Sequence, residues 1–82
     1  MHYTQVPKEM VAAFYELVDR KGQFDERDIK RITIPVDGDA EATFRGLKYA
    51  NALKEVALER GDITYSYKYN MYFAQRQILK FG

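Results

Sequence analysis

Residues 53–65, LKEVALERGDITY, contain the point at which the spacing of apolar side chains changes. Before Gly61 the apolar residues recur every three or four positions, which is the spacing of an amphipathic helix. After it, from Ile63 to Phe73, apolar and aromatic residues occupy every second position, as in a strand or hairpin. Glycine often ends a helix because it adopts the left-handed conformation easily. The stretch therefore predicts a long helix that ends at Gly61 and a strand that begins at Ile63.

The long helix is predicted to start at about Ala40 and to run to Arg60. Its apolar face comprises Gly46, Tyr49, Ala50, Leu53, Val56 and Ala57, widened by Phe44 and Leu47. The Gly46–Ala50 spacing predicts tight packing of another element against this helix. Three carboxylates, Asp37, Asp39 and Glu41, precede or begin the helix, where the positive end of its dipole favours them.

An earlier amphipathic helix is predicted from Pro7 to Lys21. Proline suits a first helical turn, and Gly22 supplies a left-handed cap at the other end. Asp25 is predicted to cap a short helix that continues to about residue 30 or 31, with Asp28 completing a capping box.

A short edge strand is predicted over Ile32–Val36, where apolar residues alternate with other residues and Pro35 cannot donate to a ladder. The turn of the C-terminal hairpin is predicted at Tyr69-Asn70. Its return strand is then expected from about Met71 to Lys80. The alternative is that Asn70 caps a final helix from Met71 to Phe81.

Together these elements predict a single domain, residues 1–82, of the α+β class. Two principal helices and a short helix pack on a small antiparallel sheet that ends in a β-hairpin. A chain of 82 residues is the size of one domain. The first residues lack the apolar core of a signal peptide, and no stretch approaches 18 apolar residues. A cytoplasmic protein with no membrane partner is therefore the expectation.

The composition argues against catalysis. The chain has no cysteine and one histidine, His2, at the terminus, so neither a thiolate nor an anchored imidazole is expected. Counting a calcium loop from Asp37 places Ala42 and Lys48 where glycine and glutamate are needed. We therefore expect no enzyme activity, no metal site and no cofactor.

The net charge of +1 conceals an uneven distribution. Residues 37–62 carry four basic and six acidic side chains, whereas residues 63–82 carry three basic and no acidic ones. The same last segment contains six of the twelve aromatic residues. A basic, tyrosine-rich segment can contact phosphates and bases, or can anchor a protein interface.

The order of the elements resembles that of winged-helix domains. The residues that carry the resemblance are Glu9–Gly22, Gln23–Ile29, Ala42–Gly61 and the junction Asp62–Tyr65. The resemblance implies a nucleic-acid-binding or transcription-regulatory protein whose long helix enters the major groove and whose hairpin meets the backbone. It implies groove contacts from Arg45 and Lys48, and phosphate contacts from Lys68, Arg76 and Lys80.

The alternative function is a small protein-binding adaptor or inhibitor, for example one from a phage or another mobile element that blocks a host protein complex. Its expected anchors are the tyrosines of the hairpin, because tyrosine is frequent at interface hot spots. Tyr65 and Tyr67 are predicted to pack on the helices, with Tyr69 and Tyr72 more exposed near the turn. A dimer is compatible with either function.

Overall fold

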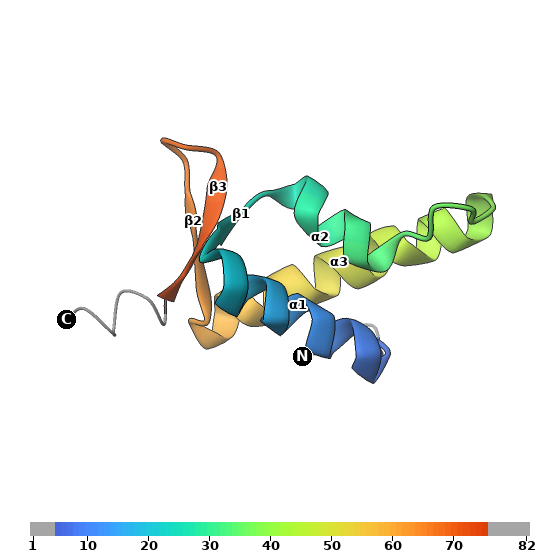
Figure 1. The fold of residues 1–82 in the computed structure, drawn as a ribbon, viewed down its shortest axis with the longest axis horizontal. Helices are drawn as coiled ribbons and strands as arrows, with labels where there is room; N and C mark the ends of the chain where they lie inside the picture. Colours follow the sequence, from blue (N-terminus) through green and yellow to red (C-terminus); the bar gives the residue numbers. More distant parts are fainter. Residues whose placement is uncertain (1–4, 76–82) are drawn as a thin grey trace.

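The computed structural model describes residues 5–75 and has three helices and a three-stranded sheet in that range (Figure 1). The elements in chain order are α1 (Lys8–Lys21), β1 (Gln23–Phe24), α2 (Glu26–Thr33), α3 (Ala40–Arg60), β2 (Ile63–Ser66) and β3 (Met71–Ala74). The predicted α+β class and the C-terminal hairpin are confirmed.

The predicted helix ends are confirmed by their caps. Gly22 and Gly61 follow α1 and α3 in the left-handed conformation, with φ of 73° and 80°. Asp25 and Asp28 form the capping box of α2, each side chain accepting a hydrogen bond from the other residue's backbone N–H. Asp39 accepts from the Ala42 N–H at 2.8 Å at the start of α3. Local signals therefore set these boundaries.

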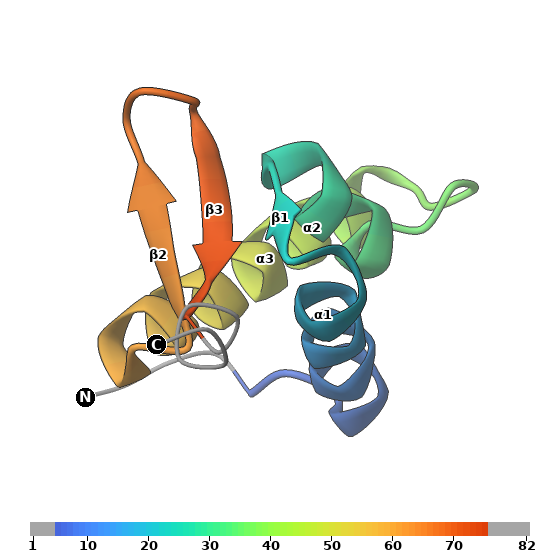
Figure 2. The same cartoon turned by 60° about the vertical axis from the view of Figure 1, so that its left-hand side comes forward.

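The sheet is antiparallel and has the strand order β1-β3-β2. Figure 2 shows the β2–β3 hairpin rising beside α2, on the same side of α3. Its turn spans residues 67–70, with Asn70 left-handed at φ 58° as predicted. The strand that begins at Met71 is confirmed as far as Ala74, and residues 76–80 of the predicted return strand lie outside the described residues.

The strand predicted over Ile32–Val36 is wrong. Ile32 and Thr33 extend α2 by two residues, and the Ile34 N–H bonds the Lys30 carbonyl at 2.8 Å, so the alternation belongs to a helix end. The third strand is instead Gln23–Phe24, which pairs with β3. Two residues show no periodicity, and their pairing depends on a strand about 50 positions later in the chain.

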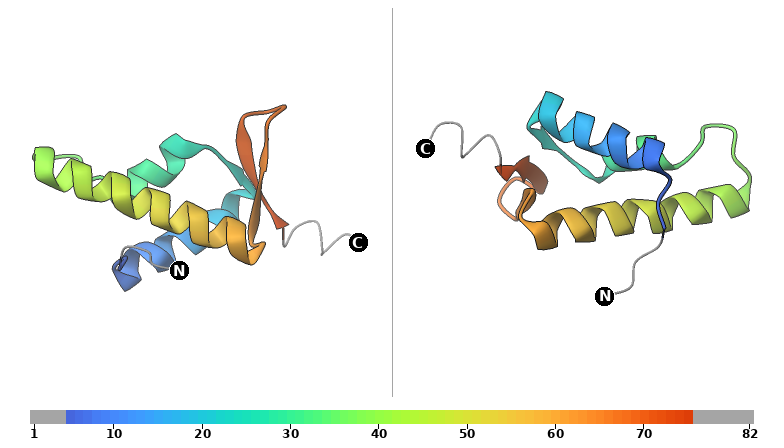
Figure 3. Two further views of the ribbon diagram at one scale, coloured as in Figure 1. Left: turned by 180° about the vertical axis from the view of Figure 1, so that it is seen from behind. Right: turned by 90° about the horizontal axis from the view of Figure 1, so that it is seen from below.

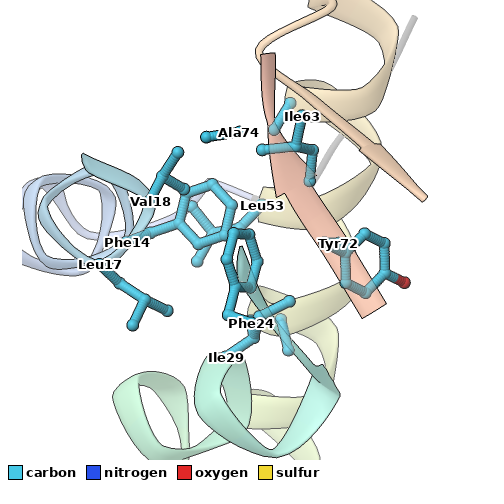
Figure 4. Packing of buried hydrophobic residues seen from close by; sticks show 11 residues of the cluster. Phe14, Leu17, Val18, Phe24, Ile29, Leu53, Ile63, Tyr72 and Ala74 are labelled. Carbon is cyan, nitrogen blue, oxygen red and sulfur yellow. The ribbon is translucent and has the colours of Figure 1, made fainter. Parts of the chain in front are cut away.

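The core is aromatic and lies where the helices meet the sheet. Figure 4 shows the rings of Phe14 of α1 and Phe24 of β1 near its centre, with Ile63 of β2 and Tyr72 of β3 on the side of the hairpin. The rings of Phe14 and Phe24 contact edge to face, with centroids 6.0 Å apart. This cluster ties all three helices to the sheet.

Gly46 lies where α2 and α3 cross. A methyl group at its Cα would lie 2.6 Å from the Thr33 carbonyl oxygen, so the predicted close packing is confirmed. Phe44 and Leu47, in contrast, were predicted to widen the buried face and are exposed, Phe44 by 61%. The first half of α3 extends beyond α1, accompanied by the 34–39 loop (Figures 1 and 3), so α1 does not cover this half of the helix.

Among residues 5–75, no helix is long and apolar enough to cross a lipid bilayer.

Candidate functional site

A hollow of about 490 Å³ lies between the first turn of α2 and the β2–β3 hairpin. We call it the hairpin groove. Its walls are Asp25, Glu26 and Arg27 on one side, Tyr65, Tyr67, Asn70 and Tyr72 on the other, with Leu58 of α3 between them. The volume lies in the range of roughly 300–1,000 Å³ typical of small-ligand sites.

The aromatic residues of the groove wall form a series of ring contacts that begins in the core. Phe24 stacks on Tyr72 at 5.7 Å between ring centroids, and Tyr72 contacts Tyr65 at 4.9 Å. Tyr65 then meets Tyr67 at 4.9 Å with the ring planes 86° apart. The series leads from fully buried Phe24 to Tyr67, which is 89% exposed. Tyr67 is therefore an exposed ring supported from behind by packed rings.

The prediction for two of the four tyrosines is wrong. Tyr67 was expected to pack on the helices, and it lies exposed in the turn; Tyr72 was expected near the surface, and it is 6% exposed. The reason is the register, in which Tyr72 pairs directly with Tyr65 and so shares its inward face. Tyr65 is half-buried and Tyr69 is exposed, as expected.

A network of polar side chains links Glu26 and Tyr72 of the groove walls to Lys54 of α3. Lys54 donates to the Glu26 carboxylate at 2.6 Å, and the Tyr72 hydroxyl donates to the same oxygen at 3.4 Å. The hydrogen bond from Lys54 holds the pKa of Glu26 below its ordinary value. Burial raises the pKa of the Tyr72 hydroxyl. Glu26 is thus a carboxylate with its charge compensated, and the network joins α2, α3 and β3.

The other polar groups at the groove differ in the hydrogen bonds and ion pairs that they make. Asp25 is occupied as the cap of α2, whereas Arg27 is exposed and has no ion pair within residues 5–75. Asn70 accepts a hydrogen bond from the Tyr65 hydroxyl. The amide nitrogen of Asn70 and the guanidinium of Arg27 are therefore available as donors.

The predicted nucleic-acid contacts are spread over two parts of the molecule. Arg45 lies 3.9 Å from the Glu41 carboxylate, and the Lys48 ammonium lies 4.9 Å from the Phe44 ring centroid, both in the projecting half of α3. Lys68 lies in the hairpin turn, 5.3 Å from the ring centroid of Tyr69. Arg76 and Lys80 lie outside the described residues.

Sequence reasoning missed Arg27 and Leu58 as wall residues. Neither has a local signal, because each becomes part of the groove only when β1 brings α2 alongside the hairpin. The exposure of Phe44 was likewise missed, and the length of α3 relative to α1 was the available clue.

Comparison with protein-family models, curated proteins and solved structures finds no match to this chain.

Proposed function

We propose that the chain is a winged-helix-like nucleic-acid-binding module of a regulatory kind. The observation that carries the proposal is a hairpin with exposed tyrosines and Lys68 in its turn, next to the consecutive helices α2 and α3. The element order α1-β1-α2-α3-β2-β3 and the strand order β1-β3-β2 support it, because winged-helix domains place a hairpin wing beside the third helix in this manner.

The hairpin, more than the start of α3, is the proposed contact surface. Lys68 and exposed Tyr67 and Tyr69 lie in its turn, and cations beside aromatic rings suit phosphates and bases. The start of α3 carries Asp39 and Glu41, whose charges repel phosphates. The protein is therefore proposed to bind nucleic acid with its hairpin, without inserting the first turn of α3 into a groove.

A titration of labelled duplex and single-stranded DNA at several salt concentrations tests the proposal. The logarithm of the affinity should fall with the logarithm of the salt concentration by about 0.9 per neutralised phosphate on duplex DNA. Replacing Lys68, Arg76 and Lys80 with alanine should lower both the affinity and this slope. The control removes two exposed cations of α1, Lys8 and Arg20. The affinity of this control variant should fall more steeply with salt than the affinity of the triple variant does. Unchanged affinity and slope in the triple variant, or no binding by the wild type, would overturn the proposal.

A specific observation keeps a protein-binding adaptor or inhibitor as the second candidate. Val36 is 98% exposed, and it is joined at the projecting end of the molecule by exposed Phe44. Aromatic and aliphatic side chains of this kind anchor protein interfaces. A co-purifying protein that is lost on Phe44→Ala or Tyr69→Ala, with the fold intact, would support this candidate. A partner indifferent to both changes would contradict it.

A further inference from the structure

We propose that the hairpin groove binds one unpaired base of a single-stranded nucleic acid, with Tyr67 as its stacking platform and Arg27 as the contact to the adjacent phosphate. This inference rests on the proposed nucleic-acid-binding function and specifies the form of the ligand. It does not require the sequence of bases to be read.

Shape is the first argument for an unpaired base. A base in a duplex is stacked on both faces and paired at its edge, so it cannot enter a hollow between a helix and a hairpin. An unpaired base offers a free aromatic face, which stacks on aromatic side chains without regard to sequence. The groove has the volume for such a ligand, about 490 Å³, and its wall includes Tyr67, which is 89% exposed.

Preorganisation of the platform is the second argument. The Tyr67 ring meets Tyr65 at 4.9 Å, and the Tyr65 hydroxyl is fixed by its hydrogen bond to Asn70. Asn70 is itself held in the turn, where its N–H donates to the Ser66 carbonyl at 2.8 Å. The ring against which Tyr67 packs is therefore held in place before a base stacks on Tyr67, which favours binding.

The charges at the groove form the third argument. Of its two carboxylates, Glu26 has its charge compensated by lysines, whereas Asp25 caps α2 and keeps its charge. Glu26 receives Lys54 at 2.6 Å and lies 3.9 Å from Lys30, while Asp25 accepts the Asp28 N–H at 3.1 Å. Arg27 is the cation among the lining residues of the groove, exposed and without an ion pair within residues 5–75. A guanidinium in this position suits a phosphate oxygen.

The groove offers both a hydrogen-bond acceptor and a hydrogen-bond donor to the edge of the base. The Glu26 carboxylate can accept from an exocyclic amino group, and the Asn70 amide can donate to a base carbonyl. Either contact can be made with several bases, so broad base tolerance is expected. The inference covers single-stranded DNA and RNA alike, since they share bases and phosphates.

Fluorescence anisotropy with three labelled probes of 15 nucleotides or base pairs tests this inference: oligothymidylate, oligouridylate and a mixed-sequence duplex. Tyr67→Ala should weaken binding to at least one single-stranded probe by about 5- to 150-fold, the size of one lost base–aromatic stack. Tyr67→Phe should keep affinity within about twofold, since the ring remains. The ratio of the two single-stranded affinities tells DNA from RNA.

Arg27→Ala should weaken single-strand binding and reduce the salt slope by about 0.7, the value for one phosphate contact on a single strand. The matched control is Arg20→Ala, which removes the same side chain from an exposed position of α1 that does not line the groove. It should leave the affinity for the single-stranded probes within about twofold. Circular dichroism of each variant confirms that the fold is retained.

The outcomes separate this inference from the proposed function. Duplex binding without single-strand binding, or equal losses on duplex and single-stranded probes in Tyr67→Ala, overturns the groove as a base site and leaves the proposed function standing. Loss in Arg20→Ala equal to that in Arg27→Ala also overturns it. Absence of binding to all three probes overturns both.

Discussion

The two halves of α3 are similar in sequence character and opposite in surroundings. Both carry apolar residues at helical spacing, yet Leu53 and Ala57 of the second half are buried and Phe44 of the first half is 61% exposed. The second half contributes Leu53 and Ala57 to the core cluster formed with α1 and the sheet, whereas the first half extends beyond α1 beside the end of α2 and the 34–39 loop (Figure 3). Helical periodicity therefore identifies a face that can be buried, and the lengths of neighbouring elements decide how much of it is buried.

The largest expected effect comes from removing a phenylalanine ring from the buried core. The same change in the projecting half of α3 serves as the comparison. Phe14→Ala leaves a cavity in the fully buried centre and should lower the free energy of unfolding by about 3–5 kcal/mol. Phe44→Ala should change it by no more than about 1 kcal/mol, since only an exposed cation–π contact with Lys48 is lost. Urea denaturation measures both values.

Because small domains are marginally stable, Phe14→Ala can be too unstable for a complete unfolding curve. Phe14→Leu then serves as a milder variant, and it should still be less stable than Phe44→Leu. Equal losses at Phe14 and Phe44 would show that the projecting half of α3 is packed in solution, contrary to the structure.

The next effect concerns Gly46, the point at which the projecting half touches the body. Alanine is favoured over glycine inside a helix by about 1 kcal/mol, so an isolated helix would gain stability from Gly46→Ala. Here the new methyl group would lie 2.6 Å from the Thr33 carbonyl oxygen and 2.7 Å from Ile34 Cγ1. Overpacking of this kind typically costs about 1–3 kcal/mol.

We therefore expect Gly46→Ala to be destabilising overall by about 1 kcal/mol in urea denaturation. The control is Asn51→Ala, at an exposed position of the same helix, which should be neutral or slightly stabilising. A stabilised Gly46→Ala variant would mean that α2 and α3 separate easily at this crossing.

The boundaries of the helices could be predicted from sequence because their signals are local. Gly22, Gly61 and Asp39 each act on backbone groups within a few residues of themselves. The α+β class and the hairpin followed from the change of periodicity at Ile63. In contrast, β1 could not be predicted, because two residues carry no pattern and become a strand only by pairing with β3.

The candidate site was predicted only in part, and again the reason is distance along the chain. The aromatic character of the hairpin was visible in the sequence, but exposure of individual tyrosines depends on turn length. A four-residue turn after Ser66 places Tyr67 outside the sheet and Tyr72 opposite Tyr65. The other wall of the groove, including Arg27, depends on β1 and could not be inferred for the same reason as β1 itself.

The smallest expected effect concerns the link between α2 and the second half of α3, the Glu26–Lys54 hydrogen bond. Because Lys54 holds the pKa of Glu26 below its ordinary value of 4.5, the folded state favours the ionised carboxylate. The stabilisation is then fully present above pH 4.5 and is lost as the pH falls through the lower pKa of the folded state. Since the Glu26 side chain is about half exposed, the contribution should be roughly 0.2–1 kcal/mol.

The measurement is the free energy of unfolding of the wild type and of Glu26→Gln between pH 7 and pH 3. The wild type should be the more stable at pH 7, and the difference should shrink toward acid, because glutamine has no proton to gain. Glu55→Gln is the control, since Glu55 is exposed and makes no ion pair within residues 5–75. Salt should reduce the difference for Glu26 only modestly if Lys54 is as shielded in solution as its 21% exposed side chain indicates. A difference that stays constant with pH would mean that the packing of residue 26, and not its charge, holds α2 against this half of α3.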